Sequence, residues 1–268
     1  MYCSSDEIMK RIFIPVLVAV ALVSGCSRLH MKDDNDPANN WTVERAYKEA
    51  KKAMDSGNYT LAVKYYEFLE TRYPFGVIGR QSLLDLAYVY YKTQKYDEAA
   101  SSCDRFIKLY PQNPATDYAY YLKGLVEFDR GRSTADRFLG VDESQRDPAN
   151  AKKAFKVFQE LADRYPNSRY LKDAQQRMVY LRNLLAQYEI NVANYYMRRG
   201  AFIAAADRAN YVVKNYERST AVPKALVIMA KCYKILEMNS LYEDTLRVLR
   251  LNYPDNPGIR ELEKTHVD

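Results

Sequence analysis

Two stretches of the chain decide its fold, because they align without a gap at an offset of 143 residues. The first is LLDLAYVYYKTQKYDEAASSCDRFIKLYPQNP (residues 83–114), and the second is LVIMAKCYKILEMNSLYEDTLRVLRLNYPDNP (residues 226–257). The matched positions pair Leu83 with Leu226, Ala87 with Ala230, Tyr90 with Tyr233, Phe106 with Leu249, Tyr110-Pro111 with Tyr253-Pro254, and Asn113-Pro114 with Asn256-Pro257. One small position differs, since Ala99 falls on Tyr242. This agreement indicates an internal repeat.

A Tyr-Pro pair marks the end of each copy of the repeat. It occurs at Tyr73, Tyr110, Tyr165 and Tyr253, and Tyr216 begins a fifth copy in which glutamate replaces the proline. The tyrosines are 37, 55, 51 and 37 residues apart. This spacing predicts a unit slightly longer than 34 residues with two insertions. We place the five units at residues 41–76, 77–115, 116–167, 168–219 and 220–257.

The matched positions have physical roles in a helical repeat. Ala87 and Ala99 are small where two antiparallel helices would cross closely, and Pro111 cannot continue the second helix. A pair of helices cannot bury its own apolar face, so stacked neighbours share one core. The pattern resembles the tetratricopeptide repeat. We therefore predict an all-α fold in which five helix-turn-helix units form a curved solenoid.

Two units depart from the regular length. Residues 130–150 form a long connection inside the third unit, and long loops in compact folds are usually functional or disordered. Residues 170–199 contain no proline or glycine and keep helical periodicity. The fourth unit is therefore expected to open with an overlong helix. Because Glu217 replaces its closing proline, the end of its second helix stays an open question.

Residues 1–25 have the anatomy of a cleaved secretory signal. Lys10 and Arg11 precede an apolar run at residues 12–23, which is shorter than the roughly 20 residues that span a bilayer. The sequence VSGC at residues 23–26 resembles the lipobox of bacterial lipoproteins, whose cysteine becomes the acylated first residue. The alternative is cleavage by the ordinary signal peptidase, with Cys26 incidental. Acidic residues near the start make Met9 an alternative to Met1 as the first residue.

Resemblance to bacterial lipoproteins implies that Cys26 carries a diacylglycerol and an N-acyl chain. Several acyl chains hold a protein firmly on a membrane, whereas a single chain holds it only marginally. In such lipoproteins an aspartate after the cysteine retains the protein in the inner membrane, and here that residue is Ser27. The implied location is the outer membrane, facing the periplasm. Residues 26–40 are polar and charged and predict a flexible tether, and residues 258–268 are assigned as a tail.

The composition argues against an enzyme. The chain has two histidines, His30 and His266, and it lacks the glycine-rich phosphate loops and the Gly-x-Ser-x-Gly elbow. We therefore expect no catalytic residues, no metal and no cofactor other than the covalent lipid. The net charge of +6 is modest for a chain with 28% charged residues and does not indicate nucleic-acid binding. Cys103 and Cys232 are interpreted as buried free thiols, with a periplasmic disulfide as the alternative.

Part of the large tyrosine set is placed to line a groove. In tetratricopeptide repeats the first helix of each unit lines the concave surface. Counted from the small residue of each first helix, the side chains expected there are Tyr47, Lys51, Tyr88, Tyr91, Lys92, Tyr118, Tyr121 and Phe128. Aromatic residues alternating with lysines suit an extended peptide with aromatic side chains and a free carboxylate. The alternative is that several of them are core or ordinary surface residues.

A set of arginines follows the predicted overlong helix and its partner, namely Arg177, Arg182, Arg198, Arg199 and Arg208. Arginine is favoured at interfaces because its planar fork pairs with carboxylates through two hydrogen bonds. The set predicts a docking surface for a partner protein, and the alternative is a solvated helix face.

The lipobox, the five repeats and the stretch FLGVDESQRDP (residues 138–148) together resemble the BamD (ComL) family of lipoproteins. The stretches YPNS (165–168) and YEINVANYY (188–196) add to a resemblance that covers essentially the whole mature chain. It implies a non-enzymatic scaffold of the β-barrel assembly machinery of Gram-negative bacteria. Such a scaffold joins the periplasmic domains of the barrel-forming subunit to accessory lipoproteins. It is also expected to help recognise the C-terminal signal of unfolded outer-membrane proteins.

Two other protein classes remain as alternatives. A pilotin-like lipoprotein that assists secretin or pilus assembly should have evenly spaced repeats, whereas two intervals here are 55 and 51 residues. A peptidoglycan-processing enzyme built on a helical superhelix would need an appended catalytic domain, and none fits after Pro257.

Overall fold

A computed structural model describes residues 40–130, 132 and 142–264 of the 268-residue chain. The chain divides into two parts, Met1–Thr42 and Val43–Asp268, and residues 40–42 are the described portion of the first part. Cys26, the signal peptide, nearly all of the predicted tether, most of the inserted connection and residues 265–268 lie outside the described residues. The fold described below is that of the second part, Val43–Asp268, which holds the helices of all five repeat units.

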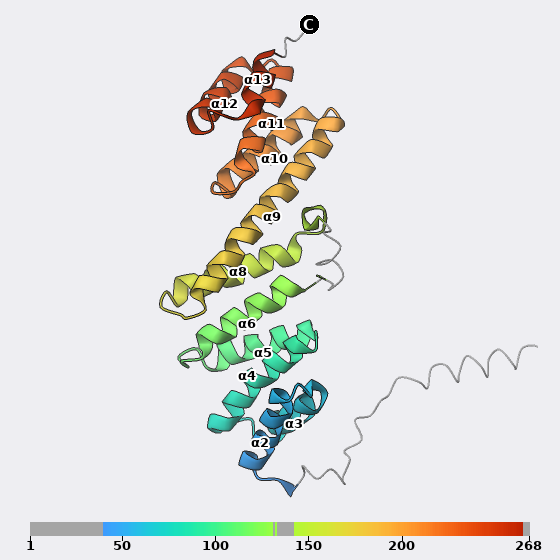
Figure 1. Cartoon of the computed structure of the whole chain (residues 1–268), viewed down its shortest axis with the longest axis vertical. Helices are drawn as coiled ribbons and strands as arrows, with labels where there is room; N and C mark the ends of the chain where they lie inside the picture. Colours follow the sequence, from blue (N-terminus) through green and yellow to red (C-terminus); the bar gives the residue numbers. More distant parts are fainter. Residues whose placement is uncertain (1–39, 131, 133–141, 265–268) are drawn as a thin grey trace, which may run out of the picture. The chain divides into compact units, whose positions relative to one another are not determined.

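The described residues of the part Val43–Asp268 contain eleven α-helices and one short 3-10 helix. In chain order they are α2 (Val43–Asp55), α3 (Tyr59–Arg72), α4 (Gly76–Lys92), α5 (Tyr96–Leu109), α6 (Thr116–Asp129), η2 (Glu143–Gln145), α8 (Ala149–Arg164), α9 (Leu171–Arg198), α10 (Phe202–Asn215), α11 (Val222–Ile235), α12 (Asn239–Asn252) and α13 (Pro257–Lys264). Consecutive α-helices pack against each other throughout the stack (Figure 1). The prediction of an all-α fold built from paired helices is confirmed.

Small residues lie where the first helix of each unit crosses its neighbours. Ala50, Ala87, Ala193 and Ala230 are completely buried, and the third unit has Gly124 at the same position. A Cβ atom on Gly124 would clash with the ring of Phe158 from α8, which is itself completely buried. At Gly124 there is therefore no room even for a methyl group, whereas the four alanine positions hold a methyl group and are completely buried.

The ends of the helices repeat the same backbone geometry. Each second helix ends at the tyrosine of its marker pair, with φ between −130° and −140° and ψ between 42° and 64°. Tyr216 belongs to this set although glutamate follows it. The fourth unit therefore ends as the others do, and its missing proline does not alter the turn. In the first, second, fourth and fifth units a left-handed residue makes the turn between the two helices, namely Gly57, Gln94, Gly200 and Glu237.

Helix α9 is 28 residues long, twice the length of its partner α10, and it contacts α8, α10 and α11. The predicted tail contains a further helix, α13, which packs on α11 and buries Ile259 and Leu262. Asn256 accepts a hydrogen bond from the backbone of Gly258 at the start of this helix. Helix α13 thus covers apolar surface that the last repeat would otherwise expose.

Candidate functional site

Tyrosine hydroxyls on the first helix of one unit bind aspartates on the first helix of the next. The three hydrogen bonds run from Tyr47 to Asp85 (2.9 Å), from Tyr91 to Asp129 (2.5 Å) and from Tyr121 to Asp173 (2.8 Å). They join α2 to α4, α4 to α6 and α6 to α9. Three of the eight predicted groove residues therefore hold neighbouring units together. Their aspartate partners were not predicted from the sequence.

The protonation states of these groups follow from their burial. Burial raises the pKa of Asp85, and hydrogen bonds from Gln81, Tyr47 and Tyr66 only partly offset that effect. Burial, followed by the hydrogen bond to Asp129, also raises the pKa of Tyr91. The tyrosines are consequently protonated donors at neutral pH, as the three bonds require.

The other predicted groove residues differ in their availability. Tyr118 is partly buried against the core beside Tyr170, with ring centroids 5.3 Å apart, and Phe128 lies under the guanidinium groups of two arginines. Lys51 and Lys92 are exposed, and Tyr88 is half-buried. The groove assignment remains a prediction, and its accessible side chains are Lys51, Tyr88 and Lys92.

The five predicted docking arginines do not form one cluster. Arg177 donates to Asp173 (2.6 Å), and Arg208 donates to the buried carboxylate of Glu189 (3.1 Å). Arg182 is half-buried, and its Nε atom has no hydrogen-bond partner among the described residues. Arg177 and Arg198 are 21 positions apart on α9, which corresponds to about 30 Å along the axis.

Arg198 and Arg199 are exposed at the C-terminal end of α9. Arg199 lies over the ring of Tyr195 (5.4 Å), and within the described part of the chain neither arginine forms an ion pair. Arg198 also lines an open hollow of about 460 Å³ between η2 and α9, together with Tyr188 and Tyr195. None of the residues that line this hollow is acidic. This part of α9 is the accessible remainder of the predicted docking surface.

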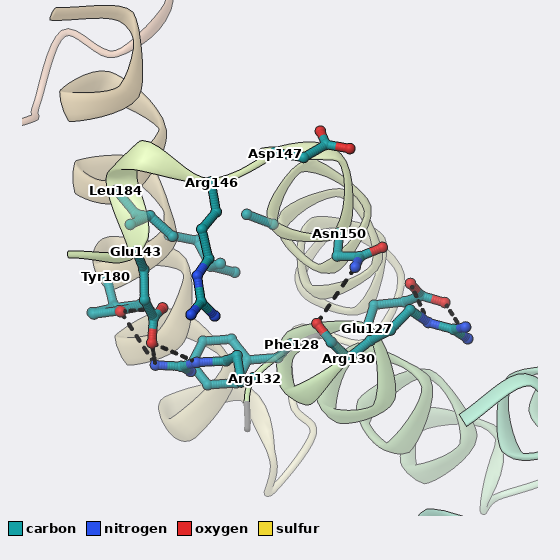
Figure 2. Close-up of a pocket in the computed structure, with 12 residues that line it drawn as sticks. Glu127, Phe128, Arg130, Arg132, Glu143, Arg146, Asp147, Asn150, Tyr180 and Leu184 are labelled. Atoms are coloured by element: carbon teal, nitrogen blue, oxygen red, sulfur yellow. Dashed lines mark hydrogen bonds and ion pairs between the residues drawn. The ribbon is translucent and has the colours of Figure 1, made fainter. Parts of the chain in front are cut away.

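A second cavity, of about 230 Å³, lies where the inserted connection returns to the fold. Figure 2 shows the residues that line it. The Nε and Nη2 atoms of Arg132 donate to one oxygen of Glu143 at 2.9 and 2.8 Å. Tyr180 of α9 donates to the other oxygen at 2.8 Å. The guanidinium group also lies over the rings of Phe128 (4.5 Å) and Tyr180 (5.3 Å). Arg132 and Glu143 are only 18% and 17% exposed, so this ion pair is well shielded from water.

Ser144, in the short helix η2 that follows the insertion, attaches this segment to α9. Asn191 of α9 donates to the backbone oxygen of Ser144 (3.2 Å) and to its hydroxyl (2.9 Å), and Asp142 accepts from the Ser144 backbone. Glu143 and Ser144 belong to the stretch at residues 138–148 that carried the family resemblance. That stretch was the sequence signal for this contact, although the partners on α9 could not be read from it.

Three further features of the described residues could bear on function, namely a metal site, a membrane-spanning helix and a reactive cysteine. Among residues 40–130, 132 and 142–264, no set of histidine, cysteine or acidic side chains is arranged to bind a metal. None of the helices that the structure describes is long and apolar enough to cross a membrane. Cys103 and Cys232 are both buried and free, as interpreted from the sequence.

Comparisons with known proteins then identify the family. A family model described as outer membrane lipoprotein (YfiO) matches residues 39–248. The outer membrane protein assembly factor BamD of Neisseria meningitidis serogroup B is 42% identical over 253 residues, which cover 94% of this chain and 95% of the relative. The chain belongs to the BamD family. The BamD relative of Neisseria gonorrhoeae is 44% identical over 93% of each chain.

Membership of the BamD family defines this chain as an outer membrane lipoprotein and a non-enzymatic assembly factor. The family match therefore favours the resemblance stated from the sequence over the pilotin-like and peptidoglycan-processing alternatives. Among solved structures, Pseudomonas aeruginosa PilF superposes with a TM-score of 0.39 at 13% identity, covering 85% of this chain and 82% of PilF. A likeness at this level does not distinguish one helical-repeat protein from another.

Proposed function

We propose that this chain is the periplasm-facing scaffold lipoprotein of an outer-membrane β-barrel assembly machinery. Acyl groups on Cys26 hold it to the membrane, and its repeats join the periplasmic domains of the barrel-forming subunit to accessory lipoproteins. The observation that carries the proposal is the correspondence, over nearly the whole length of both chains, with relatives that are assembly factors. Metabolic labelling with a fatty acid tests the anchor, because Cys26→Ser should abolish the label.

The proposed docking surface for the barrel-forming subunit is the exposed C-terminal end of α9. Arg198 and Arg199 have no competing ion pair within the described residues, and the hollow beside them lacks acidic side chains. Arginines in that state are free to pair with carboxylates on a partner through two hydrogen bonds. Arg177 and Arg208 contribute less in this proposal, because each already binds a carboxylate of its own chain.

A charge-reversal experiment tests this surface. Arg198→Glu with Arg199→Glu should weaken copurification of the barrel-forming subunit in mild detergent, because it removes an attraction and adds a repulsion. The matched control is Lys153→Glu with Lys156→Glu, which makes the same change in charge on an exposed face of α8. Equal copurification by both double variants would show that the two arginines are an ordinary solvated face.

The proposal also assigns recognition of substrate C-terminal signals to the groove of the first repeats. Tyr88 and Lys92 lie one turn apart on α4, where they offer an aromatic surface beside a positive charge. We expect Tyr88→Ala with Lys92→Glu to weaken binding of a peptide that ends in an aromatic residue and a free carboxylate. The same peptide with an amidated end should bind weakly to the unmodified chain. Crosslinking of the peptide to the last two units alone would contradict this assignment.

A further inference from the structure

The start of α4 exposes two large apolar side chains, Phe75 at the residue before the helix and Val77 in its first turn. Phe75 is 84% exposed and Val77 is 73% exposed, so neither side chain contributes to the core. Gly76 between them has φ +85°, and no atom lies within 4 Å of where its Cβ would be. Phe75, Gly76 and Val77 form a projecting tip, which we call the apolar tip.

The other repeats provide an internal comparison for the apolar tip. After the marker pair, the position of Phe75 is occupied in the four later units by Gln112, Asn167, Arg218 and Asp255. The backbone at the preceding tyrosine is nearly the same in all five units. The turn therefore folds with a polar residue at this position, and the stability of the repeat does not explain the phenylalanine. An exposed apolar pair at a single turn instead indicates contact with something outside the chain.

The surroundings of the apolar tip are also apolar. A shallow hollow of about 480 Å³ adjoins it, lined by Val43, Tyr73, Pro74 and Ile78 as well as the tip itself. Arg72 is the charged residue of this lining, and it is exposed. An apolar surface with a tyrosine and an arginine at its margin resembles the composition of protein surfaces that rest in the interface of a bilayer.

The position of the apolar tip along the chain favours a lipid surface over a protein partner. The chain is an outer membrane lipoprotein, and the predicted acylated residue, Cys26, precedes Val43 by 17 residues. A chain of that length spans at most about 60 Å, so the first repeat is confined near the bilayer. Trp41, the single tryptophan of the chain, lies two residues before Val43, and tryptophan is enriched at membrane interfaces. The later repeats, whose turns are polar, lack this proximity in sequence.

We propose that the apolar tip inserts into the periplasmic leaflet of the outer membrane. Phe75 and Val77 enter the boundary between headgroups and acyl chains, and Arg72 lies among anionic headgroups. The contact fixes the first repeat at the membrane surface, in addition to the anchor at Cys26. It goes beyond the proposed scaffold function, because it requires neither the barrel-forming subunit nor a substrate.

The test uses the acylated mature chain reconstituted in vesicles of phosphatidylethanolamine with a minority of phosphatidylglycerol. Phe75→Cys carries an environment-sensitive fluorophore, and Gln112→Cys carries the same label at the equivalent position one repeat later. Cys103 and Cys232 are buried and should not react. We expect the label at position 75 to shift to shorter wavelength and to be quenched by brominated lipid. The label at position 112 should show neither change.

A second measurement uses the native side chains. Phe75→Gln with Val77→Ser gives the tip the polarity of the later turns, and its melting temperature should match that of the unmodified chain because both residues are exposed. In the Cys26→Ser chain, which lacks the acyl groups, these substitutions should lower vesicle binding about tenfold or more, since two apolar side chains no longer leave water. Equal quenching at positions 75 and 112, or unchanged vesicle binding, would overturn the proposal. A response of the label only when a purified protein partner is added would do so as well.

Discussion

Replacing Tyr91 with phenylalanine tests whether a tyrosine hydroxyl that bonds to the next repeat stabilises the stack. The hydroxyl of Tyr91 donates to Asp129 at 2.5 Å, and this bond connects α4 to α6. Asp129 is only 9% exposed, so water cannot readily replace the lost donor. The substitution removes one oxygen atom and leaves the ring in place.

The expected cost follows from the charge of the acceptor. A hydrogen bond to a charged group contributes about 1.5–3 kcal/mol to stability. For a domain of this size, each kcal/mol lowers the melting temperature by about 2–4 °C. Tyr91→Phe should therefore lower it by about 4–8 °C, if the loss is taken as about 2 kcal/mol. The matched control is Tyr88→Phe on the same helix, because Tyr88 forms no hydrogen bond through its hydroxyl among the described residues.

Circular dichroism during heating, repeated in urea, measures both variants. Tyr88→Phe should melt within about 1 °C of the unmodified chain, since it keeps the half-buried ring and removes a hydroxyl that forms no hydrogen bond among the described residues. A double-mutant cycle with Asp129→Asn then isolates the coupling between Tyr91 and Asp129. If Tyr91→Phe and Tyr88→Phe melted at the same temperature, the inter-repeat bonds would not stabilise the stack and this reasoning would be wrong.

Three further predictions follow from other contacts. Arg132→Ala should lower the unfolding free energy by about 2 kcal/mol in urea titrations, because the largely shielded carboxylate of Glu143 loses the guanidinium of Arg132 and keeps, among the described residues, only the hydrogen bond from Tyr180. Arg132→Lys should restore only part of this loss. Tyr121→Phe should be destabilising at neutral pH, and the difference should shrink in acid melts. Burial alone would raise the pKa of Asp173, but the hydrogen bonds from Arg177 and Tyr121 lower it below its ordinary value, so the stabilisation is lost as pH falls through that lowered pKa. Cys232 should resist alkylation at neutral pH until the chain is unfolded, since burial raises the pKa of its thiol to about 11, and rapid labelling of the folded chain, detected by mass spectrometry, would contradict this.

The sequence was sufficient for the helical class and for the crossings of the helices. Both follow from local rules, because Ala87 and Ala230 can be recognised as small residues at a fixed distance from a tyrosine and a helix end. The end of the fourth unit was left open for lack of a proline. Its geometry instead follows the tyrosine, since Tyr216 adopts backbone angles similar to those of Tyr253. The marker of the turn is thus the tyrosine, and proline is dispensable.

The candidate site was less predictable because it depends on the register between helices. Tyr47 and Tyr91 each bind an aspartate 38 residues later, and a shift of one residue between units would place another side chain there. No rule of composition or periodicity fixes that register. The five arginines were grouped because they lie close together in the sequence. A helix as long as α9 nevertheless places Arg177 and Arg198 about 30 Å apart. Helix α13 had a usable signal in Pro257, Ile259 and Leu262, the spacing of a short amphipathic helix.

The length of α9 has a mechanical consequence for the proposed scaffold. Its N-terminal half contributes Ala174 and Leu181 to the core around Phe158, whereas its C-terminal half contributes Leu185 and Ile190 to the core of the last two units. One uninterrupted helix therefore crosses the boundary between two cores that otherwise share only partly buried residues. A connection through a turn could bend at that boundary, but a continuous helix transmits orientation across it. Glu143 and Ser144 contact α9 on either side of this boundary, so in the proposed scaffold η2 and α9 would together hold the predicted groove of the first repeats in a set orientation to the proposed docking surface at the C-terminal end of α9.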